Sequence, residues 1–120
     1  MIRAFVLACL IWSVPAAFAQ ERAVSGTGAI LRGLDKVNGE TVDVEVMSGA
    51  TEIVFGLDVS LADCRYPPDN PTGNAYAYLA IWNRGEAGAV FEGWMIAASP
   101  ALNALDHSRY DVWVLRCITS

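Results

Sequence analysis

The amino-acid sequence predicts a mainly β fold, a small antiparallel β sandwich or barrel with one short helix between the last two strands. Three observations lead to this prediction. Apolar and polar residues alternate over several short stretches, which is typical of strands that bury one face. Turn-forming residues separate these stretches at short intervals. A single segment, which opens with Ser99-Pro100, carries the signals of a helix start.

The first strands are expected between residues 29 and 61. The apolar run 29–34 leads into a turn with Asn38-Gly39, a strong hairpin signal because both residue types tolerate positive φ. Residues 41–46 then alternate, with valines on one face, which predicts a half-buried strand. After a turn at 47–50, the alternation over 52–61 predicts one further strand with Gly56 at a bulge or a close approach.

The alternation is lost near residues 61–64, where we expect a kink or a strand end. Residues 65–74 contain three prolines, so they are expected to form a long exposed loop. The run 75–82 is apolar on both faces, which predicts a central strand covered on both sides. A hairpin loop at 83–88 connects it to a partner strand over 89–97.

The helix signal lies between this hairpin and the last strand. Ser99 is a good N-cap, and Pro100 suits the first helical position because its φ is already fixed. Leu102 and Leu105 lie on one stripe of a helix of about two turns, which ends at 106–108 and needs tertiary packing to exist. The final run, 110–118, predicts the last strand.

The N-terminus reads as a secretory signal peptide over residues 1–19. One basic residue precedes an apolar run, and Ala17-Phe18-Ala19 offers small residues to a signal peptidase, so cleavage is expected after Ala19. The apolar run is too short to span a bilayer, which takes about 20 residues, and we expect no transmembrane segment. A lipid-attachment box that ends at Cys9 is the less favoured alternative.

Removal of this leader leaves an arm over 20–28, expected to be flexible, and a single β domain over 29–120. It also leaves two cysteines, Cys64 and Cys117. An even pair in an exported protein predicts a disulfide, and two buried free thiols are the alternative. The bridge is expected to tie an early strand, or its sheet, to the last one.

The charge balance excludes some classes of partner. The chain has 8 basic and 13 acidic residues, a net charge of −5, and loss of Arg3 with the leader makes it −6. Nucleic acids and anionic membrane surfaces need clusters of Lys and Arg, so we expect neither as a partner. No phosphate-binding loop or serine nucleophile pattern is found, and we expect no cofactor.

Several segments resemble one bacterial family, the exported proteins called domain of unknown function 2155. The resemblance is strongest over 91–107 and 110–117, and it extends to 31–36, 55–59 and 64–68. One departure is Ser108, where the family usually has proline, and this affects the local turn. The resemblance implies a periplasmic protein of Gram-negative bacteria. It implies no activity and brings no catalytic residues.

The single histidine, His107, is the first candidate for chemistry. As a general base it would need an acid partner, which Asp106 or Asp111 could supply. The favoured alternative is a structural role at the C-terminal end of the helix, where its charge suits the dipole. A zinc site is not expected, because such sites need three or four ligands.

Glu92 is the second candidate, since it lies among apolar neighbours. A carboxylate in such surroundings can have a raised pKa and act as an acid. The favoured alternative is a structural pair with Arg116 or a place at the sheet edge.

The aromatic residues provide the binding candidates. Tyr76, Tyr78 and Trp82 share one face of their strand. They either fill the core, which is the commoner use of large aromatics, or form a platform on which sugars or a peptide stack. The sequence therefore favours a binding or assembly module, with an envelope protein or a cell-wall component as its partner. A small hydrolase-like enzyme using Glu92 and His107 with a neighbouring aspartate is the alternative.

Overall fold

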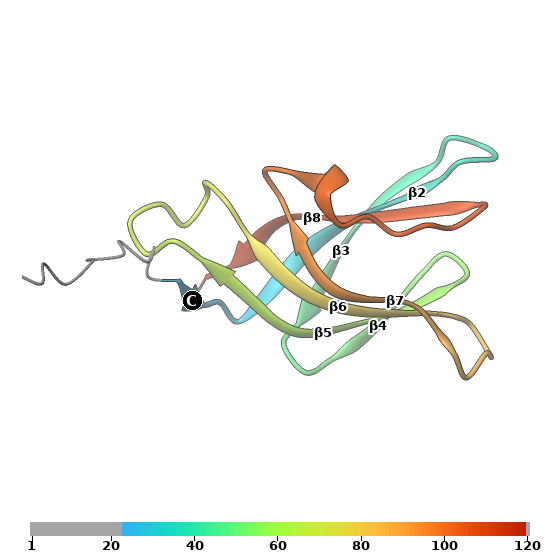
Figure 1. Ribbon diagram of the computed structural model, residues 1–120, viewed down its shortest axis with the longest axis horizontal. Coiled ribbons are helices and arrows are strands. Elements are labelled where there is room, and N and C mark those ends of the chain that lie inside the picture. Colours follow the sequence, from blue (N-terminus) through green and yellow to red (C-terminus); the bar gives the residue numbers. More distant parts are fainter. Residues whose placement is uncertain (1–22, 120) are drawn as a thin grey trace, which may run out of the picture.

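The computed structural model describes residues 23–119, which form eight strands and one 3-10 turn (Figure 1). The predicted signal peptide and the alternative lipid-attachment cysteine lie outside the described residues. The elements are β1 (Val24–Ser25), β2 (Gly28–Asp35), β3 (Thr41–Met47), β4 (Thr51–Val54), β5 (Leu57–Tyr66), β6 (Tyr76–Asn83), β7 (Ala89–Ile96), η1 (Pro100–Leu102) and β8 (Tyr110–Ile118).

The strands build two antiparallel sheets that face each other (Figure 1). The larger sheet has the order β1-β5-β6-β7, with β4 also paired to β5, and the smaller sheet has the order β3-β2-β8. The predicted antiparallel β sandwich is confirmed, and the sheets do not close into a barrel. Strand β6 lies centrally in its sheet, as predicted, between β5 and β7.

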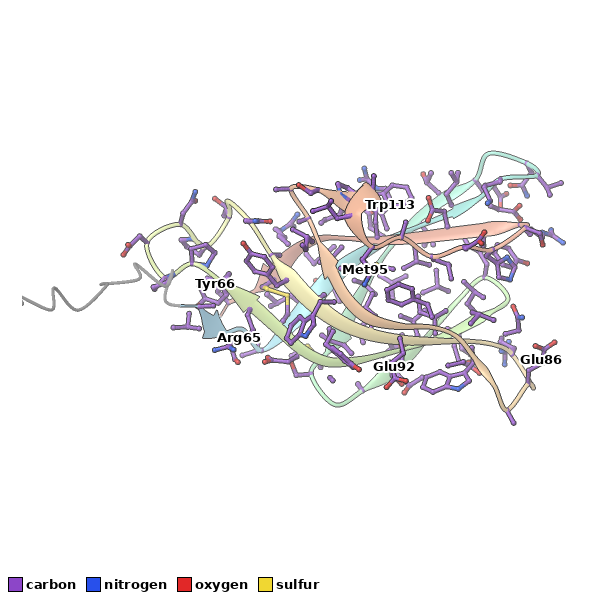
Figure 2. The ribbon with its side chains drawn as sticks, viewed as in Figure 1. Arg65, Tyr66, Glu86, Glu92, Met95 and Trp113 are labelled. Carbon is purple, nitrogen blue, oxygen red and sulfur yellow. A yellow bond between two sulfur atoms is a disulfide. The ribbon has the colours of Figure 1, made fainter. Side chains whose placement is uncertain are left out.

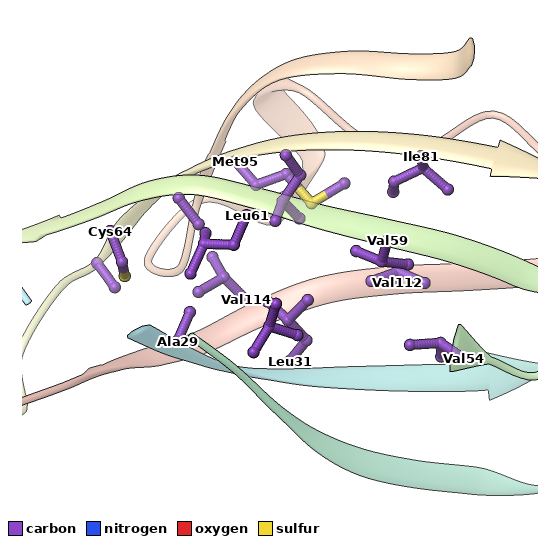
Figure 3. Packing of buried hydrophobic residues seen from close by; sticks show 14 of the residues in the cluster. Ala29, Leu31, Val54, Val59, Leu61, Cys64, Ile81, Met95, Val112 and Val114 are labelled. Carbon is purple, nitrogen blue, oxygen red and sulfur yellow. The ribbon is translucent and has the colours of Figure 1, made fainter. Parts of the chain in front are cut away.

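The core lies between the two sheets and follows from the alternation along each strand (Figure 3). Its largest fully buried side chains come from both sheets: Leu31, Val46, Val54, Leu57, Val59, Leu61, Leu79, Ile81, Val112 and Val114. These are aliphatic residues of moderate size. The fully buried centre of the sandwich thus contains none of the described tyrosine or tryptophan rings, and Tyr66 and Tyr110 pack against it as partly buried residues.

The first predicted hairpin is confirmed. Strands β2 and β3 pair in register around the turn, where Gly39 has φ 77°. The amide of Gly39 donates to the carbonyl of Asp35, and the amide of Asp35 donates to the carbonyl of Glu40. The loop is thus longer than a two-residue turn, and only its glycine occupies the left-handed region.

The prediction of one strand over 52–61 is wrong, because the chain turns back at Phe55-Gly56. Phe55 has φ 53°, and its ring stacks on Tyr110 with the ring centroids 5.7 Å apart. Gly56 lies against the side chain of Tyr110, and a Cβ added at Gly56 would be 3.0 Å from that side chain. The reversal divides the segment into β4 and β5. Ile53 is consequently 54% exposed, although the single-strand pattern placed it on a buried face.

The loss of alternation near residues 61–64 marks a β-bulge inside β5. The pairing register with β6 shifts between Leu61 and Asp63, and Ala62 is exposed. The bulge changes the residues that face inward from odd to even numbers, so that Cys64 is fully buried. A second register shift, opposite Ile30 and Leu31 of β2, changes the inward residues of β8 from even to odd numbers, so that Cys117 is buried.

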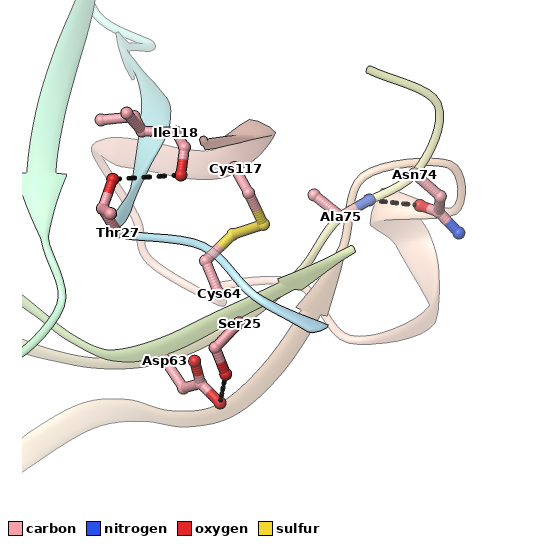
Figure 4. The surroundings of a disulfide bond; sticks show 8 residues. All are labelled: Ser25, Thr27, Asp63, Cys64, Asn74, Ala75, Cys117 and Ile118. Carbon is pink, nitrogen blue, oxygen red and sulfur yellow. Dashed lines mark hydrogen bonds between the residues drawn. A yellow bond between two sulfur atoms is a disulfide. The ribbon is translucent and has the colours of Figure 1, made fainter. Parts of the chain in front are cut away.

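The predicted disulfide between Cys64 and Cys117 is confirmed, and it joins the two sheets (Figure 4). Next to it, the amide of Gly26 donates to the carbonyl of Cys64, and the amide of Thr27 donates to the carbonyl of Ile118. The chain thus passes from one sheet to the other beside the disulfide. Residues 24–28, expected within a flexible arm, are held by these bonds and by β1.

The predicted two-turn helix is wrong, because only the single turn η1 forms. Ser99 makes no side-chain cap bond, and Leu102 is 74% exposed, although Leu105 is buried. A helix of this length nucleates poorly unless packing supports it. The side chain of Asn103 instead donates to the carbonyl of Trp94 at 2.9 Å, so the segment covers the edge of β7 in an irregular conformation.

Candidate functional site

The side of β6 that faces away from the smaller sheet carries the predicted binding residues. Ala77, Leu79 and Ile81 point into the core and are fully buried. The residues that alternate with them lie on the outer side and are half-buried: Tyr76, Tyr78, Ala80 and Trp82. The predicted burial of both faces of this strand is therefore wrong for the outer face, which has no second layer of strands on it.

Trp94 of β7 extends this aromatic surface. It lies directly opposite Tyr78, and the two rings meet edge to face with centroids 5.3 Å apart. Trp94 is 40% exposed. We use the name aromatic face for the set Tyr76, Tyr78, Trp82 and Trp94. The sequence alone did not place Trp94 in this set, because the register between β6 and β7 is set by their pairing in the sheet.

Glu92 lies on the same outer side, as Figure 2 shows, whereas Met95 of the same strand points toward the smaller sheet. The Tyr78 hydroxyl donates to Glu92 Oε1 at 3.3 Å. The charge of Glu92, together with partial burial and this hydrogen bond, raises the pKa of Tyr78. The predicted pairing of Glu92 with Arg116 is wrong, because Arg116 lies in the other sheet near Asp43.

Acidic and basic side chains surround the aromatic face. Asp58 and Asp63 of β5 lie opposite Trp82 and Tyr78 in the sheet. Asp58 forms an ion pair with Arg84 at 3.8 Å. Asp63 accepts a hydrogen bond of 3.2 Å from the hydroxyl of Ser25 (Figure 4). Stacking rings are thus combined with half-buried carboxylates that can accept hydrogen bonds.

His107 is held by hydrogen bonds on both ring nitrogens. Its Nδ1 accepts from the backbone amides of Arg109 and Tyr110, at 3.0 and 3.1 Å. The proton of the neutral ring must therefore be on Nε2, which donates to Asn83 Oδ1 at 2.7 Å. The expected role as a helix cap is wrong, since the helix is absent. His107 instead orders the loop before β8.

The other candidate catalytic residues do not share these contacts. Asp106 is exposed, and Asp111 Oδ1 accepts from the backbone amide of Val112 at 2.9 Å. Glu92 binds Tyr78 on the outer side of the larger sheet. Among residues 23–119, the hydrogen bonds of Glu92, His107 and Asp111 thus lead to different partners. The geometry provides no His–carboxylate pair of the kind that general base catalysis uses.

A buried carboxylate that the sequence did not single out lies near His107. Asp35 is only 3% exposed. Burial raises the pKa of Asp35, but hydrogen bonds from the Arg109 guanidinium and the Val37 amide outweigh it, so the pKa is lowered overall. Lys36 donates to the carbonyl of His107. The hydrogen bond between His107 and Asn83 of β6 connects this network to the larger sheet at the Tyr110 end of β8, and the disulfide joins the two sheets near the other end of β8.

A cleft of about 400 Å³ lies between the last strands of the two sheets. It is lined by Met95, Ile96, Pro100, Ala101, Ala104, Asp111, Val112, Trp113 and Val114. Figure 2 labels Met95 and Trp113, which come from the two different sheets. Asp111 is the one ionisable residue of this lining, so the cleft suits apolar groups. Sequence analysis could not find it, because it depends on the path of the irregular segment after β7.

Between residues 23 and 119, the structure holds no group of three or more His, Cys, Asp or Glu side chains arranged to bind a metal ion. In the same part of the chain, no helix is long and apolar enough to cross a membrane.

Comparison with known protein families gives one match over residues 29–117, to the family described as an uncharacterized protein conserved in bacteria, DUF2155. Comparisons with curated proteins and with solved structures gave no match. The family match includes every strand from β2 to β8 except the last residue of β8 and the first of β2. The chain therefore belongs to the bacterial family called domain of unknown function 2155.

Proposed function

We propose that the protein is an exported, disulfide-stabilised binding domain of the bacterial cell envelope, and that its aromatic face stacks against the sugar rings of a cell-wall glycan. The placement of the rings is the main support. Large aromatic side chains contribute most when they are buried in a core. Here the core is filled by aliphatic residues, whereas Tyr76, Tyr78, Trp82 and Trp94 remain on the outer side of the larger sheet.

The polar surroundings support the choice of ligand class. One side of a sugar ring presents C–H groups that pack on an aromatic ring, and its hydroxyl groups donate to carboxylates such as Glu92 and Asp58. The net charge of −5 disfavours anionic polymers and lipid surfaces. An uncharged or amino-substituted glycan fits both properties of the surface.

Export and a periplasmic location belong to the same proposal. The N-terminal apolar run with Ala17-Phe18-Ala19 has the features of a signal peptide, and the disulfide suits an oxidising compartment. Fractionation of expressing cells, with mass spectrometry of the purified protein, tests this part. The expected result is a periplasmic protein that begins at Gln20, and a cytoplasmic protein that retains Met1 would contradict it.

The binding proposal is tested with two ligands, purified peptidoglycan in a pull-down and soluble chitin oligosaccharides in a titration. Trp94→Ala and Trp82→Ala should each lower the affinity about tenfold, because a stacked aromatic contact contributes about 0.5–1.5 kcal/mol beyond its buried area. Trp113→Ala, which removes a half-buried tryptophan from the other sheet, is the matched control and should bind normally. Equal binding by all variants, or no binding by the unmodified protein, would refute the proposal.

A further inference from the structure

His107 uses both nitrogens of its ring to hold the loop before β8. Its Nδ1 accepts from the backbone amides of Arg109 and Tyr110, and its Nε2 donates to Asn83 Oδ1 at the end of β6. A neutral imidazole has one acceptor and one donor nitrogen, whereas the protonated ring has two donors and no acceptor. Uptake of a proton at Nδ1 is therefore incompatible with both amide contacts.

The side chain of Asn83 fixes which nitrogen carries the proton of the neutral ring. Asn83 Nδ2 donates to Glu86 Oε2 at 3.1 Å, so Oδ1 is the atom that faces His107. Because this oxygen can only accept, Nε2 must donate. The two amides on the other side of the ring require the same arrangement. The neutral form with its proton on Nε2 is thus the state of the ring that satisfies all three hydrogen bonds.

The loop that His107 holds also supplies the partner of a buried carboxylate. The Arg109 guanidinium donates to Asp35 Oδ2 at 3.2 Å. The carbonyl of Arg109 accepts from the amide of Lys36, and the Lys36 ammonium donates to the carbonyl of His107. Release of the Arg109 amide from His107 therefore loosens the segment whose charge compensates Asp35.

The charged and titratable groups around the ring come from three parts of the chain. They are Asp35 and Lys36 where β2 ends, Arg84 and Glu86 after β6, and Asp106, Arg109, Tyr110 and Asp111 around the start of β8. Three of these four carboxylates already accept hydrogen bonds from other groups, and the fourth, Asp106, is exposed. The ring of Tyr110 lies 5.3 Å from that of His107, but the Arg109 guanidinium is at the same distance from it. A protonated His107 therefore gains no carboxylate partner while the loop stays closed.

We propose that His107 is an acid-operated latch, whose protonation releases the loop 106–109 from β6 and draws Arg109 away from Asp35. A proton that binds the open loop better than the closed loop shifts the population toward the open loop. The disulfide holds the two sheets together near the other end of β8, so the opening is local. The latch does not depend on the glycan binding proposed for the aromatic face.

Amide hydrogen exchange followed by NMR, at pH 7 and at pH 5, tests the latch. A solvated histidine takes up its proton at about pH 6.5, so proton uptake by the open loop favours opening about 25-fold over this range. The protection factors of the Arg109 and Tyr110 amides, which correct for the pH dependence of exchange itself, should fall by this factor. The Gly26 amide beside the disulfide is the internal control and should keep its protection. Asp35 stays ionised over this range, because its pKa is lowered.

Two variants and one spectroscopic measurement separate the latch from general acid sensitivity. His107→Gln offers the amides an oxygen acceptor that takes up no proton, so the protection of Arg109 should no longer depend on pH. Asp106→Asn, which removes a neighbouring exposed charge, is the matched control and should keep the pH dependence. Nitrogen chemical shifts of the unmodified protein should show the His107 proton on Nε2 at pH 7.

Four results would overturn the proposal. These are a proton on Nδ1 at pH 7, a change below twofold in the protection of the Arg109 amide, and an equal loss of protection at Gly26. The fourth is a pH dependence that persists in His107→Gln.

Discussion

Reduction of the Cys64–Cys117 disulfide is expected to lower the free energy of unfolding by about 4 kcal/mol. The two cysteines are 53 residues apart. In the chain-entropy model, a loop of this length reduces the entropy of the unfolded chain by about 14 cal/mol/K, which corresponds to about 4 kcal/mol at room temperature. Typical domains have a total stability of about 5–15 kcal/mol, so this is a large share.

The position of the bridge supports a full effect. Both cysteines are buried, at 0% and 4% exposure, and they join strands of different sheets. Between the sheets, the disulfide is supplemented by the core side chains and by the hydrogen bonds from Gly26 to Cys64 and from His107 to Asn83. Loss of the bridge should therefore allow the sheets to separate at lower denaturant concentration without changing their internal pairing.

Equilibrium unfolding in urea provides the measurement. The oxidised protein, the same protein kept reduced, and the double variant Cys64→Ala with Cys117→Ala are compared. The reduced protein isolates the cross-link, because its sulfur atoms still fill the core, and the double variant adds the loss of that packing. A difference below about 1 kcal/mol between the oxidised and reduced proteins would refute the reasoning. If the dependence of the unfolding free energy on urea concentration also changes strongly, the removal of the bridge has changed the compactness of the unfolded state as well.

Three further predictions concern single residues. Gly26→Ala should destabilise the protein by about 1–3 kcal/mol, because the added Cβ would lie 2.6 Å from the carbonyl oxygen of Ile118. Thermal unfolding measures this loss. The control Gly88→Ala should show no such loss, because Gly88 has open space around it. Because the pKa of Asp35 is lowered in the folded state, its ionised form stabilises the protein above about pH 4, and this contribution is lost as the pH falls through the lowered pKa. Asp35→Asn should therefore reduce the acid sensitivity of the unfolding midpoint, whereas Asp69→Asn in the exposed loop should leave it unchanged. Glu92→Gln should bring the pKa of Tyr78 back toward its ordinary value of 10.0, as followed by NMR of the tyrosine rings at alkaline pH, and an unchanged titration would show that Glu92 is not the cause.

Most of the fold could be predicted because its strands obey local rules. The hairpin around Gly39, the proline-rich loop and the last strand follow from alternation and turn residues that lie close together in the sequence. The disulfide followed from the number of cysteines. The bulges that turn Cys64 and Cys117 inward appeared only as a loss of phase near residue 61, and the shift in β8 gave no signal that was recognised.

The errors have a common physical cause, which is contact between residues distant in the sequence. The turn at Phe55 is stabilised by stacking on Tyr110, a residue far along the chain, and Phe-Gly is not a recognised turn pair. The segment after Ser99 has good local helix signals, but Asn103 binds the carbonyl of Trp94 instead. Tertiary contacts outweigh such weak local preferences.

The candidate sites could be predicted only in part. The shared side of Tyr76, Tyr78 and Trp82 followed from strand alternation, but the contribution of Trp94 required the register of the neighbouring strand. The buried state of Asp35 depends on Arg109, which comes from the loop before β8. The cleft depends on the path of the segment 97–109, which no local pattern indicated.

The place of β8 has a consequence for how the molecule is made. This strand is synthesised after all the other described strands, yet β2, near the start of the described chain, needs it as a partner. Until it arrives, the larger sheet has an uncovered apolar inner side and Cys64 has no partner sulfur. Folding of the sandwich therefore waits for the synthesis of β8, and a ribosome that stops before Tyr110 would release an incomplete sandwich that is a substrate for proteolysis.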